Sequence, residues 1–167
     1  MFREMRRSGQ ALPDEEIDAV LARESHGVLA VQGDGGYPYA VPLNYVREGD
    51  HLYFHIAMEG HKLDALKNSD KASFCVIGAA ELDMERLTTH YRSVIAFGRL
   101  SLVADEAERR RLIRLLCEKF APYSHERFDY EMVHYFPNMH ILDLHMEHVT
   151  GKEEKTMAAE RRKRVQA

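Results

Sequence analysis

The sequence predicts an α+β protein that is mainly β, with six antiparallel strands forming a small barrel and helices at its edges. Three observations lead to this prediction: apolar or alternating segments of strand length, turn residues between them, and a few segments with helical periodicity. Many short strands with few helices favour a barrel over a layered α/β sheet. A chain of 167 residues has the size of one domain with a substantial core.

The predicted strands are rich in β-branched and aromatic residues and are separated by turn chemistry. Residues 51–57 alternate most clearly, with one apolar face and one face formed by His51, Tyr53 and His55. Turns are expected at 34–36 and 48–50, where glycine and acidic residues cluster. The six predicted strands are 27–31, 37–46, 51–57, 71–78, 88–103 and 139–149.

The strand over 37–46 contains Pro38 and Pro42, and proline cannot donate a hydrogen bond to a neighbouring strand. We therefore expect this strand to lie at a sheet edge or to carry a bulge. Where strand pairing is broken, backbone groups remain available to a ligand that lies along the strand.

Four segments have the periodicity of helices. The first begins at Pro13, with acidic residues in its first turn. Asp105 caps the third, and Pro122 ends it. The predicted helices are 13–24, 60–68, 105–121 and 124–135, and the mixed segment 79–87 is expected to be a loop or a turn of helix.

We expect a single domain over residues 1–150, in which 1–11 form an N-terminal arm, followed by a charged tail over 151–167 that is helical or frayed. The tail ends in the cluster Arg161-Arg162-Lys163-Arg164. Such a cluster is most often solvated surface, and contact with nucleic acid is the weaker alternative.

Composition excludes several classes of protein. A formal net charge of −4 disfavours general nucleic-acid binding. No apolar run approaches the roughly 20 residues that span a bilayer, and the N-terminus lacks the apolar core of a secretory signal. Cys75 and Cys117 lie in apolar patterns without a CxxC motif, which is typical of reduced, buried thiols. We therefore expect a cytoplasmic protein with no nucleic-acid and no membrane partner.

The segment Gly60-His61-Lys62 opens the second predicted helix. Free backbone N–H groups and the helix dipole favour an anion at such a position, and Lys62 adds a full positive charge. The ordinary alternative is a helix start with a surface lysine. No GxSxG, Walker A or GxGxxG motif is present, so the sequence supports neither those hydrolases nor a dedicated dinucleotide-binding domain.

The runs GYPYAVPLNYV, LYFHIAMEGHKLDAL and YRSVIAFGRL resemble the pyridoxamine 5'-phosphate oxidase-like FMN-binding split-barrel superfamily, and within it the nitroimidazole-resistance (Nim) branch. The resemblance covers roughly Leu12 to Lys152. It implies a six-stranded antiparallel split β-barrel of Greek-key type, FMN as cofactor, and a homodimer with the flavin at the interface.

The resemblance also implies which residues contact the cofactor. Gly60, His61 and Lys62 match a phosphate clamp, although His61 stands where many members have arginine. Because histidine is mostly neutral at pH 7, the clamp would depend more on Lys62 and on backbone N–H groups. The other implied contacts are Val41, Pro42, Leu43, Asn44, His55, Ile56 and Ser93. Asn44 and Ser93 also have ordinary interpretations, as a strand-end residue that satisfies a turn and as a plain strand residue.

His55 is the candidate for chemistry, because histidine is the usual proton donor near pH 7 and this one is expected beside the flavin. A structural role in the barrel or at the phosphate is an equal alternative for this residue. His140, His145 and His148 cluster later in the chain, and alternation places His140 and His148 on one face. We expect no metal site there, and haem binding through one of these histidines remains an alternative.

The resulting functional prediction is an FMN-dependent oxidoreductase of the nitroreductase type, which takes electrons from a donor such as NAD(P)H and passes them to a small molecule such as a nitroimidazole. Pyridoxamine phosphate oxidase activity is not expected, because the stretch HILDLHMEHVTGK has no arginine for a second phosphate. The alternatives are a non-catalytic flavin- or haem-binding split-barrel protein and a relative that has lost its cofactor.

Overall fold

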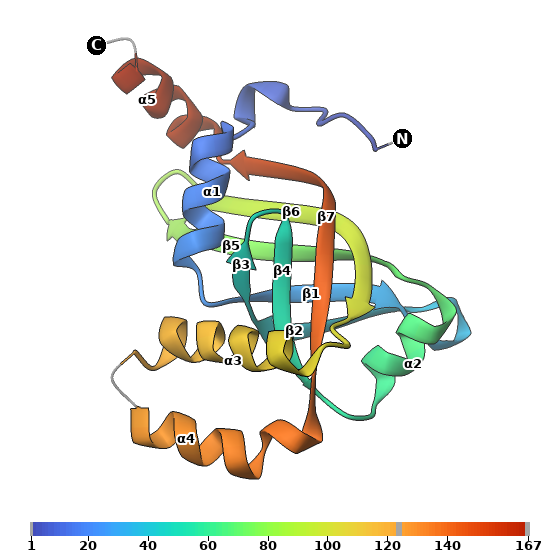
Figure 1. The fold of residues 1–167 in the computed structure, drawn as a ribbon. Coiled ribbons are helices and arrows are strands. Elements are labelled where there is room, and N and C mark those ends of the chain that lie inside the picture. Colours follow the sequence, from blue (N-terminus) through green and yellow to red (C-terminus); the bar gives the residue numbers. More distant parts are fainter. Residues whose placement is uncertain (1, 123–124, 166–167) are drawn as a thin grey trace.

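The computed structural model describes residues 2–122 and 125–165, so the predicted helix start at Ser124 lies outside the described residues. One open antiparallel sheet dominates the fold, with the strand order β2-β1-β5-β6-β7-β4-β3 (Figure 1). The expected α+β class is confirmed. The strands are β1 (His26–Gln32), β2 (Pro38–Asn44), β3 (Val46–Glu48), β4 (His51–Ala57), β5 (Lys71–Asp83), β6 (Thr88–Leu102) and β7 (Met139–Glu153).

The sheet has seven strands, so the prediction of six was wrong. The predicted strand 37–46 divides at Tyr45, where β2 leaves its partner β1 and β3 begins to pair with β4. Tyr45 is fully buried, and its hydroxyl donates a 2.8 Å hydrogen bond to the carbonyl oxygen of Leu21. The division into β2 and β3 depends on the burial and hydrogen bonding of Tyr45. The periodicity of a strand sequence does not predict these contacts.

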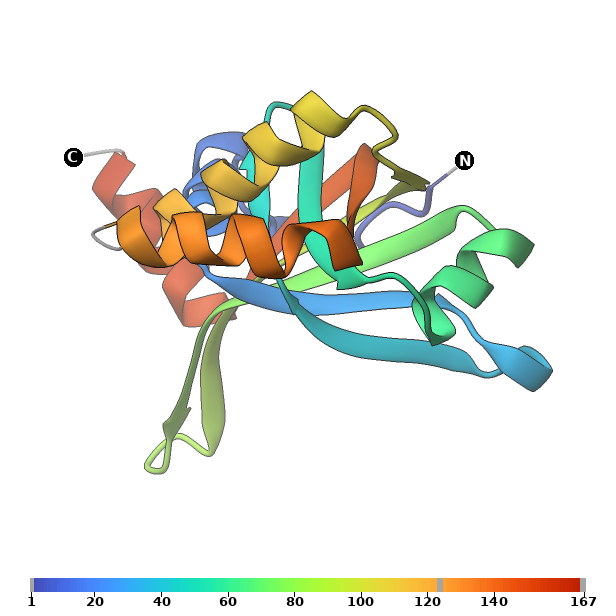
Figure 2. The ribbon, with the colours of Figure 1, turned by 60° about the horizontal axis from the view of Figure 1, so that its bottom comes forward.

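The segment 79–87 was predicted to be a loop or a turn of helix, but its residues 79–83 are strand and only 84–87 form a turn. Pairing between β5 and β6 continues past a register shift near Gly78 as far as Asp83 and Thr88. Figure 2 shows the resulting hairpin projecting from the body of the molecule. We call residues 79–91 the hairpin arm. Cross-strand hydrogen bonds hold it extended although its composition is mixed and acidic.

A second register shift lies between β6 and β7, next to Phe97 and Gly98. It reverses the alternation of side chains in the later part of β7. His140 therefore lies on the face of Leu142 and Leu144, whereas His148 stacks against Phe97 on the opposite face. The prediction that His140 and His148 share a face was wrong.

Five α-helices surround the sheet in the described part of the chain (Figure 1). α3 and α4 lie side by side over the face of β4 and β7, and α2 covers one end of the sheet. No described helix combines the length and apolar character needed to cross a bilayer. The helices are α1 (Asp14–Arg23), α2 (His61–Asn68), α3 (Glu106–Phe120), α4 (His125–His134) and α5 (Lys155–Val165), with short 3-10 turns at Ser8–Gln10, Asp34–Gly36 and Phe136–Asn138.

Two clusters of buried side chains form the core. The larger one fills the concave side of the sheet, with Phe54, Phe74 and Leu144 fully buried in it. The smaller one lies between the outer side of β4 and β7 and the helices α3 and α4, around Tyr53 and Leu112. Burial on both sides makes β4 and β7 the most enclosed part of the sheet.

The segment after residue 150 continues as strand to Glu153 and then as α5. Glu153 is fully buried, and Arg92 and Arg161 bind its two carboxylate oxygens at 3.0 and 2.6 Å. Arg161 also donates to the carbonyl oxygen of Ala11, which ties α5 to the N-terminal arm. The segment around Ala11 and α5 therefore lie next to each other. The proposed division at residue 150 remains a prediction.

Candidate functional site

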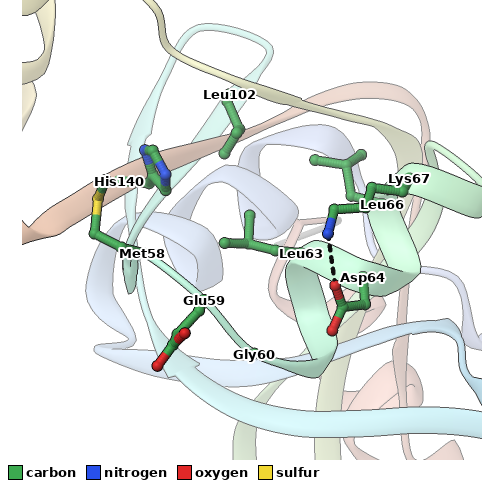
Figure 3. Close-up of a pocket in the computed structure, with 9 residues that line it drawn as sticks. All are labelled: Met58, Glu59, Gly60, Leu63, Asp64, Leu66, Lys67, Leu102 and His140. Atoms are coloured by element: carbon green, nitrogen blue, oxygen red, sulfur yellow. Dashed lines mark hydrogen bonds and ion pairs between the residues drawn. The ribbon is translucent and has the colours of Figure 1, made fainter.

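A cavity of about 710 Å³ lies between α2, the loop that precedes it, and the ends of β6 and β7. Its size is in the range of small-molecule sites. Figure 3 shows Leu63 of α2 pointing into the space between Met58, Leu102 and His140. The cavity is lined by Met58, Glu59, Gly60, Leu63, Asp64, Leu66, Lys67, Leu102 and His140.

The N-terminus of α2 borders this cavity and has no side-chain cap. Gly60 occupies the N-cap position with φ of 121°, a conformation that only glycine adopts readily, and it has no side chain to offer the helix. The first N–H groups of a helix lack partners within the helix, so they remain available to an anion. Lys62 makes no ion pair with any described residue, whereas Lys67, one turn later, is bound to Asp64 at 2.7 Å.

His61 connects the start of α2 to the edge strand β2. Its ring stacks on Tyr39 with a centroid distance of 4.1 Å. Its Nε2 atom is buried and has no hydrogen-bond partner, since the nearest carboxylate oxygen, of Asp34, is 3.6 Å away. A buried nitrogen without a hydrogen-bond partner favours a ligand at this point. Burial removes the nitrogen from water, which is unfavourable unless another group replaces the lost hydrogen bond. Neither His61 nor Lys62 lines the cavity of Figure 3.

The predicted contacts on β2 alternate between the two faces of the sheet. Val41 and Leu43 pack on the core, and Pro42 and Asn44 are exposed. β2 lies at the edge of the sheet and pairs only with β1, as its prolines predicted. Asn44 donates a 3.3 Å hydrogen bond to the carbonyl oxygen of Ser25, so its side-chain amide already has a partner within the chain.

His55 and Ile56 point to opposite faces of β4. Ile56 is buried in the main core, and His55 is exposed on the outer face opposite Ile141. Partial desolvation by its surroundings lowers the pKa of the His55 imidazole. His55 does not line the cavity, and the histidine that does is His140, the cross-strand neighbour of Ile56.

Ser93 lies apart from the other predicted residues. It faces a hollow of about 480 Å³ on the outer side of β6 and β7, which the N-terminal arm partly covers. Phe2 of the arm stacks on His148 there at 4.7 Å. Within one chain the structure therefore joins β2 to α2 through Tyr39 and His61 but leaves Ser93 in a separate hollow.

Sequence reasoning missed most of the cavity lining. The leucines of α2 and Leu102 look like ordinary core residues, and His140 was considered only for metal or haem. The one available signal was that Met58 and Glu59 directly precede Gly60, the first residue of the predicted phosphate clamp. No group of three or more histidine, cysteine, aspartate or glutamate side chains that could hold a metal ion occurs among the described residues.

Comparison with solved structures finds the same fold in several proteins of low sequence identity. A candidate 5-nitroimidazole antibiotic resistance protein from Bacteroides thetaiotaomicron has a TM-score of 0.70 and 19% identity, covering 86% of each chain. Flavocytochrome Anf3 from Azotobacter vinelandii reaches 0.78 with 22% identity over 92% of this chain and 73% of that one. An FAD and haem binding protein from Mycobacterium smegmatis reaches 0.73 with 23% identity over 89% and 74%.

These likenesses establish the fold alone, since each identity is below 25%. No curated protein matches the sequence. The family profile described as pyridoxamine 5'-phosphate oxidase matches residues 13–153, which is most of the chain. The family expected from the sequence is thereby confirmed, and this chain belongs to the pyridoxamine 5'-phosphate oxidase family.

Proposed function

We propose that the chain is an FMN-binding oxidoreductase that reduces a small molecule. The observation that carries this proposal is the start of α2, which has no side-chain cap and lies beside the edge strand β2. The free backbone N–H groups there, and Lys62, which forms no ion pair with a described residue, can bind an anion. The residues fit a flavin phosphate at this point: a cation without a carboxylate, a buried nitrogen without a partner, and a glycine that leaves the backbone accessible.

Each residue has a definite task in this proposal. Lys62 and the first N–H groups of α2 bind the phosphate, and the imidazole of His61 donates a hydrogen bond to it from Nε2. The exposed side of β2, with Pro42 and Asn44, borders the ring system. A flavin held by these residues would supply two-electron redox chemistry between a donor such as NAD(P)H and a small substrate.

The proposed partner is a second copy of the chain. Ser93 faces a different hollow from the α2 site, so a cofactor held at α2 reaches Ser93 only if another chain supplies it. A homodimer with the flavin at its interface therefore reunites the predicted contacts. The cavity beside α2, with apolar walls and His140, is the proposed place for a small substrate such as a nitroimidazole.

The visible spectrum of the purified protein and of its heat-released supernatant is the first test. Absorption near the bands of free oxidised flavin, with FMN in the supernatant, supports the proposal. Bleaching by NAD(P)H or dithionite, followed by reoxidation with 2-methyl-5-nitroimidazole, supports turnover. A colourless protein that also fails to take up added FMN contradicts the proposal.

A non-catalytic haem-binding protein is the second candidate. Its supporting observation is that His140 stands in the wall of a cavity with apolar sides, which is the environment of an axial haem ligand. The names of two proteins with this fold also mention haem or a cytochrome. A Soret band that His140→Ala abolishes would favour this candidate over the flavin enzyme.

A further inference from the structure

Two basic runs that are far apart in the sequence lie next to each other in the fold. One is Arg6-Arg7 of the N-terminal arm, and the other is Arg162-Lys163-Arg164 in the last turn of α5. The guanidinium group of Arg162 donates a hydrogen bond to the carbonyl oxygen of Gly9. The fold therefore gathers cations from two distant segments on one surface.

The short turn Ser8–Gln10 fixes the path of the arm beside α5. The backbone N–H of Gln10 donates to the carbonyl oxygen of Arg7 at 2.9 Å, which closes this turn directly after the two arginines. Gly9, which contacts α5, is two residues from Arg7, and two residues span at most roughly 7 Å. The backbone of Arg7 therefore lies within that distance of the contact with α5.

The chain neutralises none of these five cations. Each side chain is exposed, and none forms an ion pair with a described residue. Arg161 differs from them, because the buried carboxylate of Glu153 binds it at 2.6 Å. We call the five residues the basic surface, which consists of Arg6, Arg7, Arg162, Lys163 and Arg164.

The basic surface is more charged than the stability of the fold requires. Cations in the last turn of a helix interact favourably with its dipole, which accounts for one or two residues of α5 but not for Arg6 and Arg7. Like charges that lie together repel one another and destabilise the compact state. Removing these five positive charges from the formal net charge of −4 leaves −9 for the rest of the chain. Positive charge is therefore concentrated on an otherwise acidic protein.

We propose that the basic surface binds the phosphate backbone of double-stranded nucleic acid. Four of its five cations are arginines, whose forked donors match phosphate oxygens. A row of phosphates can satisfy several cations at once. The expectation of no nucleic-acid partner came from the net charge of the whole chain, whereas a phosphate backbone responds to the local distribution of charge. This inference does not rest on the proposed function or on a flavin.

The composition of α5 favours nucleic acid over a membrane surface. A helix that lies in a membrane surface buries an apolar face among the lipids. The exposed residues between positions 155 and 164 are all charged, whereas Ala158 is fully buried and Met157 is half-buried. This helix therefore has no apolar face to insert there and can attract a partner only through charge.

The lack of aromatic side chains in the basic surface favours a duplex over a single strand. Proteins that hold single strands stack the bases on aromatic side chains. Phe2, the aromatic residue of the arm, already stacks on His148 at 4.7 Å. Contacts made through charge alone suit the regular backbone of a duplex and carry no sequence preference.

Fluorescence anisotropy with a labelled DNA duplex of about 20 base pairs tests the proposal. We expect a dissociation constant below roughly 100 µM at about 20 mM salt. The logarithm of the binding constant should fall with the logarithm of salt concentration with a slope near −4, since each phosphate contact contributes about −0.9. No binding at several hundred micromolar protein, or a slope near zero, overturns the proposal.

The test variant is Arg6→Gln/Arg7→Gln/Lys163→Gln/Arg164→Gln. It removes four charges whose side chains form no ion pair with a described residue, and it keeps Arg162, which binds Gly9. We expect binding of the duplex to weaken about 100-fold at low salt and the slope to flatten to about −1. Thermal unfolding should be unchanged. Unchanged binding by this variant overturns the proposal.

The matched control is Lys67→Gln/Lys71→Gln/Arg110→Gln/Arg114→Gln, which lowers the net charge equally at exposed positions on α2, β5 and α3. Its affinity should fall less than about 3-fold. An equal loss in both variants shows that net charge alone matters and contradicts the assigned surface. Tighter binding to a single strand of the same length contradicts the assigned partner. So does binding to phosphatidylserine vesicles without binding to the duplex.

Nuclear magnetic resonance of the arginine Nε–H groups locates the contact. We expect addition of the duplex to shift the side-chain signals of Arg6, Arg7 and Arg162 most strongly. The signals of Arg110 and Arg114, which lie on α3, should change little. Shifts confined to α3, or equal at all these positions, contradict the proposed surface.

Discussion

Two regions of the molecule place cationic side chains close together, and they differ in whether the chain supplies matching carboxylates. At the end of β7, Arg92 and Arg161 both bind the buried carboxylate of Glu153, and Arg92 also binds Glu16 at 2.9 Å. At the start of α2, Lys62 has no carboxylate partner among the described residues. The Nε2 atom of His61 has no hydrogen-bond partner, and the nearest carboxylate oxygen, of Asp34, is 3.6 Å away.

The difference separates a structural role from a binding role. A cation neutralised inside the fold holds elements together and has no capacity left for a ligand. A cation left unpaired at an uncapped helix start is available for an anion from solution. The following changes test this contrast, from the largest expected effect to the smallest.

Glu153→Gln should produce the largest loss of stability. It removes the buried negative charge but keeps the side-chain volume, leaving Arg161 without a counter-ion. We expect the free energy of unfolding in urea to fall by about 3 kcal/mol or more. Glu108→Gln, at an exposed pair with Arg111, should cost about 0.5 kcal/mol. Equal effects of the two changes would show that burial does not distinguish these ion pairs.

Lys62→Met should weaken FMN binding about 10-fold to 100-fold while leaving stability nearly unchanged, because the ammonium group forms no ion pair with any residue that the structure describes. Fluorescence titration of the apo protein with FMN measures the affinity. Lys67→Met is the matched control on the same helix, since Asp64 already neutralises that lysine. If both variants bind FMN equally well, the start of α2 is not the phosphate site.

His61→Arg should strengthen FMN binding about 3-fold to 10-fold. Arginine keeps a flat group to stack on Tyr39 and adds a permanent charge with a forked set of donors. Weaker binding by this variant would indicate that His61 packs the helix against β2 and does not contact the phosphate.

His55 should make a small contribution to the pH dependence of stability. Desolvation lowers the pKa of His55 below the usual 6.5, so the unfolded chain binds its proton more readily and stability falls as pH drops through about 6.5. We expect His55→Gln to make this fall in stability shallower between pH 7 and pH 5.5. His134→Gln, at an exposed histidine of α4, serves as the control. An unchanged slope in the His55 variant contradicts this account.

The local elements were mostly predictable from the sequence. Alternation over 51–57 placed Leu52, Phe54 and Ile56 in the core, and prolines placed β2 at the sheet edge. Glycine and basic residues located the start of α2. These features depend on residues close together in the chain, where side-chain periodicity and backbone preferences act directly.

Contacts between distant segments decided the rest. Burial of Tyr45 under α1 divides one predicted strand into β2 and β3. Pairing of β5 with β6 continues past one register shift to form the hairpin arm, and a second shift, between β6 and β7, separates His140 from His148. His140 is far from Leu63 in the sequence. Pairing of Ile56 with His140 places this histidine in the same cavity as Leu63.

By itself, the sequence determined the family, the α+β class and the segment that begins at Gly60, because these follow from local pattern and resemblance. Only the tertiary structure decided which charges are neutralised. Glu153 and Arg161 are eight residues apart but meet, together with Arg92, around the buried carboxylate of Glu153, whereas Lys62 has no carboxylate partner among the described residues. Ion pairing depends on distances across the fold and on exclusion of water, and neither quantity is contained in the order of residues.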